Sequence, residues 1–428
     1  MTNTEILEQS FTSFKAEEHP VLKPLKEEAF RAYQKMGIPG VKHEEWKYTR
    51  IKSLFNKPFA IQQPAAVTEN DLKDKFLPGH EEANVICIVN GRFSKELSRI
   101  FSDEIIIQPL EEAATNENSE IVAKYLGESS KQLYDGVHAL NTAFFENGVF
   151  ISCKPGKVVE HPVYVYIISD ARAGNVFAQP RSLVYVPRAA QMQLAEIYIT
   201  IGSGESFTNG VIEIVAEQDC ILDYYKIQND SRNGSQVSNM QVHQVGKCHV
   251  HTVVITLDGG MIRNNLNVIM DAPNNEAHLY GLYFVGGETH VDNHTLVDNV
   301  EPGCFSNQLY KGIADGNATA VFNGKIYVKQ KAQKTNAYQS NKNIVISPTA
   351  SVNAKPQLEI FADDVKCSHG CTVGQLDAES MFYLKARGIP DKEAKALLIK
   401  AFAMDVLEHV KPEPLREYVF EIINEKLK

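Results

Sequence analysis

Two cysteines and a histidine lie close together in the stretch DDVKCSHGCTVGQLD, residues 363–377. They are Cys367, His369 and Cys371, in a chain of 428 residues that holds only seven cysteines. Thiolate and imidazole groups are ligands that suit zinc, copper(I) or the iron of a sulfide cluster. Three ligands are one fewer than a closed tetrahedral site needs, so the pattern indicates an incomplete or shared site. The alternative is structural, with both thiols packed as small apolar groups and the imidazole in a turn.

The spacing predicts how these side chains point. Cys367 and His369 are two residues apart, so on an extended strand they face the same side. We expect Gly370 to mark a bend that separates Cys371 from them. A helix should follow, because Asp377 is a good N-cap residue.

Other groups of potential ligands are interpreted as structural. In KCHVHTV, His249 and His251 share one face of a strand-like run and Cys248 faces the other. His290 and His294 have metal-ligand spacing only on a helix, and the sequence around them predicts strands. The chain has no GxxxxGK[ST], GxSxG, HExxH or CxxC motif, so no complete catalytic site of these kinds is predicted.

Composition narrows the class of protein. Acidic side chains outnumber basic ones by 53 to 43, and no dense run of Lys and Arg is present, so nucleic acid is not an expected partner. The most basic stretch, KQKAQK at 329–334, is interpreted as a solvated rim. The sequence contains neither a membrane-length apolar run nor a signal peptide, and its cysteines are odd in number and scattered. We expect a soluble cytoplasmic protein in a reducing compartment, without a membrane partner.

The first of three regions, residues 1–83, is predicted to be helical and to end in a connector. Its apolar residues follow a helical period that stops before Gly37. They are Leu7, Phe11, Phe14, Leu25, Ala29, Tyr33 and Met36. The only tryptophan, Trp46, is interpreted as a packing anchor.

Residues 84–370 form the second region, which is rich in β-strand patterns. Short runs such as VYVYIISD, MQLAEIYITIG and HVHTVVITL are separated by Gly, Asn, Asp or Pro. One interruption, at roughly 119–146, predicts a helix. So many short strands fit paired sandwiches, a propeller or a solenoid. Segments that recur about every 30 to 40 residues favour the solenoid, but no strict period decides.

The third region, residues 371–428, returns to a helical period. Asp377 is expected to cap a helix that ends at Gly388, and Asp391 to cap the next helix. Apolar residues then share a face on each of two further helices. They are Ala394, Leu397, Leu398, Ala401 and Phe402, followed by Leu415, Tyr418, Val419, Ile422 and Ile423. These faces need a partner, which is either the β body or another chain.

Three ordered stretches closely resemble the SufB/SufD family of iron-sulfur cluster assembly proteins. They are AVFNGKIYVKQKAQKTNAYQSNKNIVIS, KPQLEIFADDVKCSHGCTVGQLD and MFYLKARGI. The resemblance implies a mainly β fold, with a right-handed parallel β-helix core flanked by N-terminal and C-terminal α-helical regions. The chain is most like the SufD branch. It has Leu384 where SufB-type chains carry a cysteine, and it lacks their Glu-His pair near the C-terminus.

The resemblance also implies a function. The chain would be a non-catalytic scaffold subunit that pairs with a SufB-type subunit through the β-helix. Its C-terminal helices would bind a SufC-type ATPase, at Leu397, Leu398 and Phe402.

The CSH positions of the family correspond to Cys367 and His369. They are expected to hold a transient iron-sulfur cluster shared with SufB, or to admit iron to it. Cys371 departs from the pattern, since relatives tend to have a small alanine there, so it is an accessory candidate only. No cofactor is expected in the isolated chain, and reduced flavin is a candidate cofactor of the complex.

Two other hypotheses stay open at this point. The chain could be a homodimeric β-helix protein, as expected when it is alone, with a flavin-binding or iron-delivery role of its own. It could also be a carbohydrate-acting β-helix enzyme, which would need a cluster of carboxylates on one exposed face.

Overall fold

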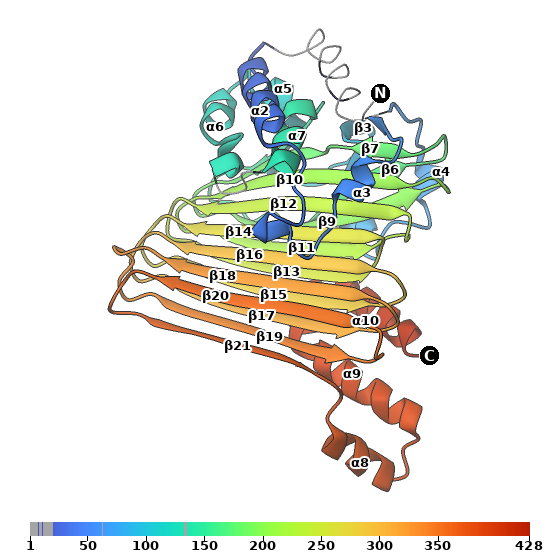
Figure 1. The fold of residues 1–428 in the computed structure, drawn as a ribbon. Coiled ribbons are helices and arrows are strands. Elements are labelled where there is room, and N and C mark those ends of the chain that lie inside the picture. The colour runs from blue at the N-terminus through green and yellow to red at the C-terminus, as the bar shows by residue number, and fades with distance from the viewer. Residues whose placement is uncertain (1–6, 8–10, 12–19, 62, 132–134) are drawn as a thin grey trace.

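The computed structural model describes residues 7, 11, 20–61, 63–131 and 135–428. Its core is a parallel β-solenoid of about eight turns, with helices at both ends of the chain (Figure 1). Successive strands alternate between two facing sheets, so each turn adds one strand to each sheet. The predicted β-helix with helical flanks is confirmed, and the sandwich and propeller alternatives are excluded.

The two sheets are called sheet A and sheet B. Sheet A runs in the order β20-β18-β16-β14-β12-β10-β8-β5-β4, with β7 beside β10 and β1 beside β7. Sheet B runs in the order β21-β19-β17-β15-β13-β11-β9-β6-β2-β3. Neighbours along the solenoid are parallel, and the pairs β2–β3 and β4–β5 at its N-terminal end are antiparallel.

The strands of sheet A are β1 (Ala60–Ile61), β4 (Ile105–Pro109), β5 (Val149–Cys153), β7 (Val176–Ala178), β8 (Arg181–Val186), β10 (Ser206–Ala216), β12 (Gly234–Gln244), β14 (Met261–Met270), β16 (His290–Asn299), β18 (Thr319–Val328) and β20 (Ser351–Ile360). Those of sheet B are β2 (Asn84–Val89), β3 (Arg92–Arg99), β6 (Val163–Asp170), β9 (Gln191–Ile201), β11 (Ile221–Asn229), β13 (His249–Asp258), β15 (Glu276–Val285), β17 (Phe305–Ala314), β19 (Asn336–Val345) and β21 (Lys366–Gly374).

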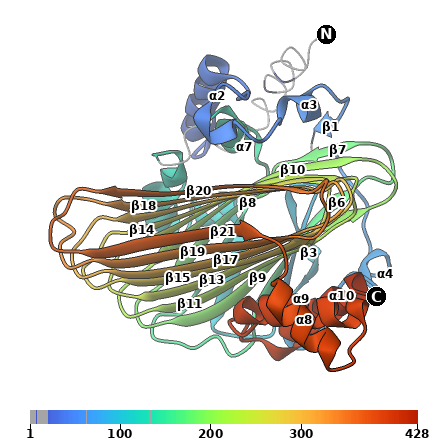
Figure 2. The same cartoon turned by 60° about the horizontal axis from the view of Figure 1, so that its bottom comes forward.

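Helices cover the outer face of each sheet. The helices before residue 60 and those between residues 110 and 144 pack on sheet A, whereas Leu72 and the helices at 391–407 and 413–426 pack on sheet B (Figure 2). The helices are α2 (Lys23–Met36), η2 (Glu44–Trp46), α3 (Lys52–Phe55), α4 (Glu69–Leu72), η3 (His80–Glu82), α5 (Leu110–Ala113), α6 (Ser119–Tyr125), η4 (Glu128–Lys131), α7 (Gly136–Phe144), α8 (Ala378–Ala386), α9 (Asp391–Leu407) and α10 (Glu413–Lys426). In the part of the chain that the structure describes, no helix is both long and apolar enough to cross a membrane.

The space between the two sheets, here called the lumen, is filled by alternate residues of each strand. On β18, Ala320, Phe322 and Ile326 are buried inward, whereas Asn323 and Lys325 face outward. Burying one large apolar side chain contributes about 1.5–3 kcal/mol, so a column of such residues on successive strands fixes the register of every turn.

The N-terminal region differs from the single helical stretch that the sequence predicts. Helical segments there are separated by turns, and α2 ends before Gly37, which adopts a positive φ of 63°. Phe11 is buried and its ring stacks on that of Phe30 at 3.8 Å, whereas Phe14 lies outside the described residues. Trp46 is 2% exposed, which confirms its packing role.

The helical interruption of the β region is longer than predicted. Its helices α5, α6 and α7 lie between residues 110 and 144, whereas the sequence indicated about 119–146. They pack on the outer face of sheet A beside α2, where Val137 and Phe144 are buried.

Two further details of the C-terminal part correct the sequence-based prediction. Strand β21 continues to Gly374, so the predicted boundary between residues 370 and 371 falls inside a strand. Asp391 is the first residue of α9, and it pairs with Lys385 and Lys395 instead of capping the helix. The cap at Asp377 is confirmed, because its Oδ2 accepts the backbone N–H of Ser380 at 2.7 Å.

Candidate functional site at the open end of the solenoid

Strand β21 carries all three residues of the CSHGC stretch. Cys367, His369 and Cys371 are in register with Ala337, Gln339 and Asn341 of β19, which are buried in the lumen. The three side chains therefore form one row that faces the end of the lumen. The prediction that the first two share a side is confirmed. The predicted bend is wrong, because the residue between His369 and Cys371 stays within the ladder of β21.

The row is an incomplete ligand set. Alternate residues of a strand are separated by about 6.6 Å, so one ion can be reached by two neighbours at most. Among the residues that the structure describes, no group of three or more His, Cys, Asp and Glu side chains is arranged to hold a metal ion. A stable site here would need ligands from another molecule.

Both thiols of the row are partly shielded from water. Cys367 is half-buried beside the apolar side chains of Ile326, Val328 and Ala337. Burial raises the pKa of the Cys367 thiol, and the backbone N–H of Ala337 offsets part of this effect. Burial also raises the pKa of the Cys371 thiol. Both groups are therefore protonated near neutral pH, and a metal ion that binds them must displace a proton.

A buried polar network lies directly beneath Cys371. Its Sγ is 3.6 Å from Oδ1 of Asn341, which also accepts a 2.7 Å hydrogen bond from Nδ2 of Asn343. Nδ2 of Asn341 donates to the backbone oxygen of Tyr310 at 3.2 Å and to the hydroxyl of Tyr283 at 3.4 Å. Sequence reasoning missed this network, although its amides alternate in AYQSNKN as inward-facing positions of a strand do.

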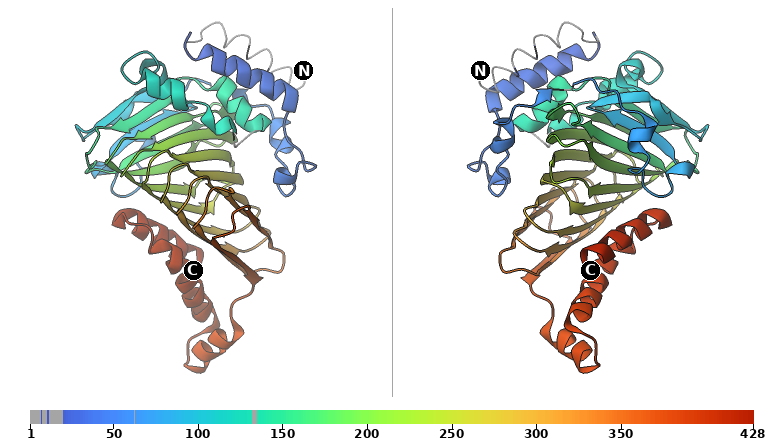
Figure 3. Two further views of the ribbon diagram at one scale, coloured as in Figure 1. Left: turned by 90° about the vertical axis from the view of Figure 1, so that its left-hand side faces the viewer. Right: turned by 90° about the vertical axis from the view of Figure 1, so that its right-hand side faces the viewer.

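The end of the lumen at β20 and β21 is open. These are the last strands of sheets A and B, and within the described residues neither has a further strand beside it. The helices α9 and α10 run beside the solenoid and α8 lies beyond its last strands (Figure 3). Large apolar side chains are exposed around this end, namely Ile360, Phe361 and Val373. Unpaired strand edges with exposed apolar groups are typical of surfaces that pair with another chain.

Comparison with known proteins places this arrangement in a family. Residues 167–402 match the SUF system FeS cluster assembly, SufBD core domain, and residues 3–165 match the SufBD protein N-terminal region. The chain belongs to the SufBD family. It is 30% identical to an iron-sulfur cluster assembly SufBD family protein of Synechocystis, over 87% of this chain and 84% of the relative. It is 26% identical to the iron-sulfur cluster assembly protein SufD of Escherichia coli, over 94% of this chain and 93% of the relative.

The C-terminal helices of this SufBD family chain keep part of their apolar surface exposed. The packed face of α9 agrees only in part with the predicted one. Ala394 is buried and Phe402 packs against sheet B as predicted, but the other buried residues are Ile399, Ala403, Val406 and Leu407. Leu397 is 47% exposed, and Leu398 is only half-buried. Phe402 is half-buried and already occupied, because Nζ of Lys311 lies 4.2 Å from the centre of its ring.

The adjacent helix α8 has no buried residue. Its Phe382 is 73% exposed and its Tyr383 is 58% exposed. These two side chains and Leu397 are exposed apolar groups on α8 and α9, which are helices in contact with each other.

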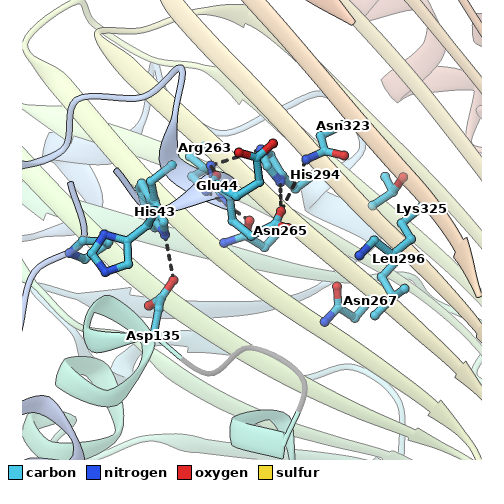
Figure 4. A pocket seen from close by; sticks show the side chains of 14 residues that line it. His43, Glu44, Asp135, Arg263, Asn265, Asn267, His294, Leu296, Asn323 and Lys325 are labelled. Carbon is cyan, nitrogen blue, oxygen red and sulfur yellow. Dashed lines mark hydrogen bonds and ion pairs between the residues drawn. The ribbon is translucent and has the colours of Figure 1, made fainter. Parts of the chain in front are cut away.

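A cavity of about 420 Å³ lies elsewhere, between residues 39–46 and the outer face of sheet A (Figure 4). Its charged groups neutralise one another. Nη1 of Arg263 is 2.6 Å from Oδ2 of Asp292, and the two ring nitrogens of His294 lie 3.3 Å from Glu45 and 2.9 Å from Asp292. Burial tends to raise the pKa of Asp292, but His294 and Arg263 outweigh it and hold this pKa well below its usual range.

This cavity does not favour the carbohydrate-acting enzyme. That chemistry needs a carboxyl group free to give or take a proton. Asp135, which lines the cavity, instead accepts the Nε1–H of Trp46 at 3.1 Å and caps α7, and the neighbouring Asp292 is held as an anion by its ion pairs. His290 is also engaged, since its Nε2 is 2.9 Å from Oγ1 of Thr49. These contacts attach the N-terminal segment to sheet A, which is the structural role that the sequence predicts for His290 and His294.

Proposed function

We propose that this chain is a SufD-like scaffold subunit of an iron-sulfur cluster assembly complex. It pairs with a SufB-type subunit at the open end of the solenoid. The observation that carries the proposal is the position of Cys367 and His369, which face the open lumen between two unpaired strand edges. A second chain docked on these edges can complete the ligand set. Because such a site is open when the chains separate or shift, a cluster built there can leave.

The chain contributes ligands and no catalysis of its own in this proposal. Cys367 supplies a thiolate and His369 an imidazole to the iron that enters the shared site. The nascent cluster is cargo, so it is not a resident cofactor. ATP hydrolysis comes from a SufC-type subunit bound to the exposed surface formed by Phe382, Tyr383 and Leu397.

The same open end accounts for a homodimer when the chain is alone. Two copies related by a two-fold axis can place one edge strand beside its equivalent, because such an interface is self-complementary. The homodimer would then occupy the surface that a SufB-type subunit uses. It would be a resting form that a SufB-type subunit displaces.

Co-expression with SufB-type and SufC-type relatives tests the proposal. The complex is purified without oxygen, and its iron, sulfide and flavin contents are measured. Cys367→Ala and His369→Ala should give complexes that form and melt normally but hold far less cluster. Ser368→Ala is the matched control, since Ser368 lies between them on the opposite, exposed face of β21. Normal cluster content in both variant complexes would contradict the assigned roles, and failure to form any complex would contradict the partnership.

A further inference from the structure

We propose that Gln339 is the positioning residue of the open-end site. Its side-chain Oε1 accepts a hydrogen bond from one ring N–H of His369 and so fixes the orientation of the imidazole. The inference rests on the proposed function only in giving His369 a ligand role.

A ladder of amides leads through the lumen to His369. Nε2 of Gln308 on β17 donates to Oγ1 of Thr295 at 2.5 Å, and Nε2 of Gln339 on β19 donates to Oε1 of Gln308 at 2.9 Å. The first bond crosses the lumen from β17 of sheet B to Thr295 on β16 of sheet A, and the second rises by one strand of sheet B toward the open end. The next position of this column is His369, which is the register partner of Gln339 on β21.

The last amide of the ladder has an unused acceptor. Gln339 is 3% exposed, and its Oε1 is buried without a hydrogen-bond partner among the described residues. Buried acceptors are costly to leave unpaired, and an exception in a native structure indicates a role. Because Nε2 is held by Gln308 in the preceding turn, Oε1 is left for the turn above. There, His369 is the residue in the same column.

The opposite sheet leaves room for this amide. Gly324 of β18 lies across the lumen, and a Cβ atom at that position would be 2.5 Å from Nε2 of Gln339 and 2.9 Å from its Cδ. Any larger residue there would displace the amide. The sequence NGK at 323–325 therefore provides the space in which Gln339 points along the lumen.

The chemistry of a histidine ligand explains the use of such an acceptor. A neutral imidazole binds iron through one nitrogen while the other carries the proton, and an acceptor for that proton selects the tautomer and holds the ring. Loss of such a partner typically weakens metal binding by about 10-fold to 100-fold. His369 is exposed at the open end of the solenoid, so this hydrogen bond would replace burial as the means of orientation.

Nitrogen NMR of the full-length chain, with ¹⁵N in the histidine rings, tests the inference without any metal. The His369 signals are assigned by their loss in His369→Gln, and spectra are taken at alkaline pH, where imidazole is neutral. The wild-type chain should show a single tautomer. Gln339→Met, which keeps the size but lacks the acceptor, should shift both ring signals toward those of a freely exchanging ring.

The matched control is Thr295→Val, which breaks the ladder two steps below and leaves Gln339 bonded to Gln308; it should leave the His369 signals unchanged. Gln339→Glu retains an acceptor oxygen, so its His369 ring signals should return to the wild-type positions that Gln339→Met loses. If Gln339→Met does not fold, Gln339→Ser takes its place, because serine is too short to reach the next turn. Identical His369 signals in the wild type and the acceptor-free variant would overturn the inference.

Ferrous iron content of the assembled complex provides a second readout. The Gln339→Met complex should bind Fe²⁺ about 10-fold more weakly than the wild type, and Gln339→Glu should recover part of that loss. If the wild-type complex binds no iron, the proposed function fails, and the ring signals still decide whether Gln339 orients His369.

Discussion

The Sγ atom of Cys371 lies 3.6 Å from Oδ1 of Asn341, the residue in register with it on the neighbouring strand. The thiol is thus attached to a buried network of amides and tyrosine hydroxyls. Cys371 is also about 13 Å along the strand from Cys367, so the two thiols cannot share one iron.

From this relationship we expect that replacing Cys371 and replacing Asn341 will have different effects on the free energy of unfolding. Cys371→Ala should change the free energy of unfolding by less than about 1 kcal/mol and leave the cluster content of the complex unchanged. Asn341→Ala should cost about 1–3 kcal/mol, because it removes one hydrogen-bond partner each from buried groups of Tyr283, Tyr310 and Asn343. Urea unfolding measures both, with the exposed Lys342→Ala on the same strand as control. An Asn341→Ala chain as stable as the wild type would contradict this account of the network.

A charge at the open end should block pairing with another chain. Val373 continues the row of Cys371 and is 49% exposed, so Val373→Asp should leave the unfolding free energy within about 0.5 kcal/mol of the wild type. It should weaken association with a SufB-type subunit at least about 10-fold, because a desolvated carboxylate is costly in an interface. Size-exclusion chromatography and binding assays check this. Val158→Asp, at a 58% exposed position in the first turns, is the control; equal loss of binding in both variants would argue against the open end as the interface.

The exposed surface of α8 and α9 should bind the ATPase subunit. Leu397→Asp should abolish pull-down of a SufC-type subunit while leaving the melting temperature unchanged, since this side chain is 47% exposed. Phe402 is a poorer target, because its contact with Lys311 means that replacing it also disturbs packing on sheet B. Phe420→Asp on α10, at a 36% exposed position, serves as control. Normal pull-down of the Leu397 variant would contradict the proposal that this surface binds the SufC-type subunit.

Acid should loosen the attachment of the C-terminal helices through His251. Burial lowers the pKa of His251 to about 3, and the nearby charges of Lys411, His409 and His278 act in the same direction. Its Nδ1 is 3.5 Å from Asp223, and Tyr280 flanks the ring. The imidazole is thus neutral in the folded chain at pH values where it is charged in the unfolded chain, whose pKa is about 6.5.

Below about pH 6.5 the unfolded chain therefore binds a proton that the folded chain does not. The free energy of unfolding should consequently fall by up to about 1.4 kcal/mol per pH unit, or about 2 kcal/mol by pH 5. In His251→Gln this part of the pH dependence should be absent. His249→Gln is the control, since that ring is 55% exposed on the same strand. Urea unfolding at several pH values compares the three chains, and parallel curves for the wild type and His251→Gln would refute the assignment.

Local sequence patterns predicted much of the architecture. Alternation of apolar and polar residues predicted the strands, and the cap at Asp377 predicted the start of α8, because both depend on neighbouring residues alone. The pattern could not separate a solenoid from a sandwich, since inward and outward alternation is the same in both. The recurrence of segments about every 30 to 40 residues favoured the solenoid without deciding for it, and the resemblance to the SufB/SufD family decided.

The sequence by itself determined which residues of this chain carry side chains of a kind that suits iron, and that Cys367, His369 and Cys371 are too few for a closed site, because ligand chemistry is a property of the side chains. The tertiary structure decided the rest. A one-residue change in register would turn Cys367, His369 and Cys371 to the outer face, and register is set by the column of apolar residues that fills the lumen. The contact of Cys371 with Asn341, and the place of Gln339 below His369, join residues 30 positions apart in the chain. Such pairs follow from the length of one complete turn of the solenoid, which no short stretch of sequence contains.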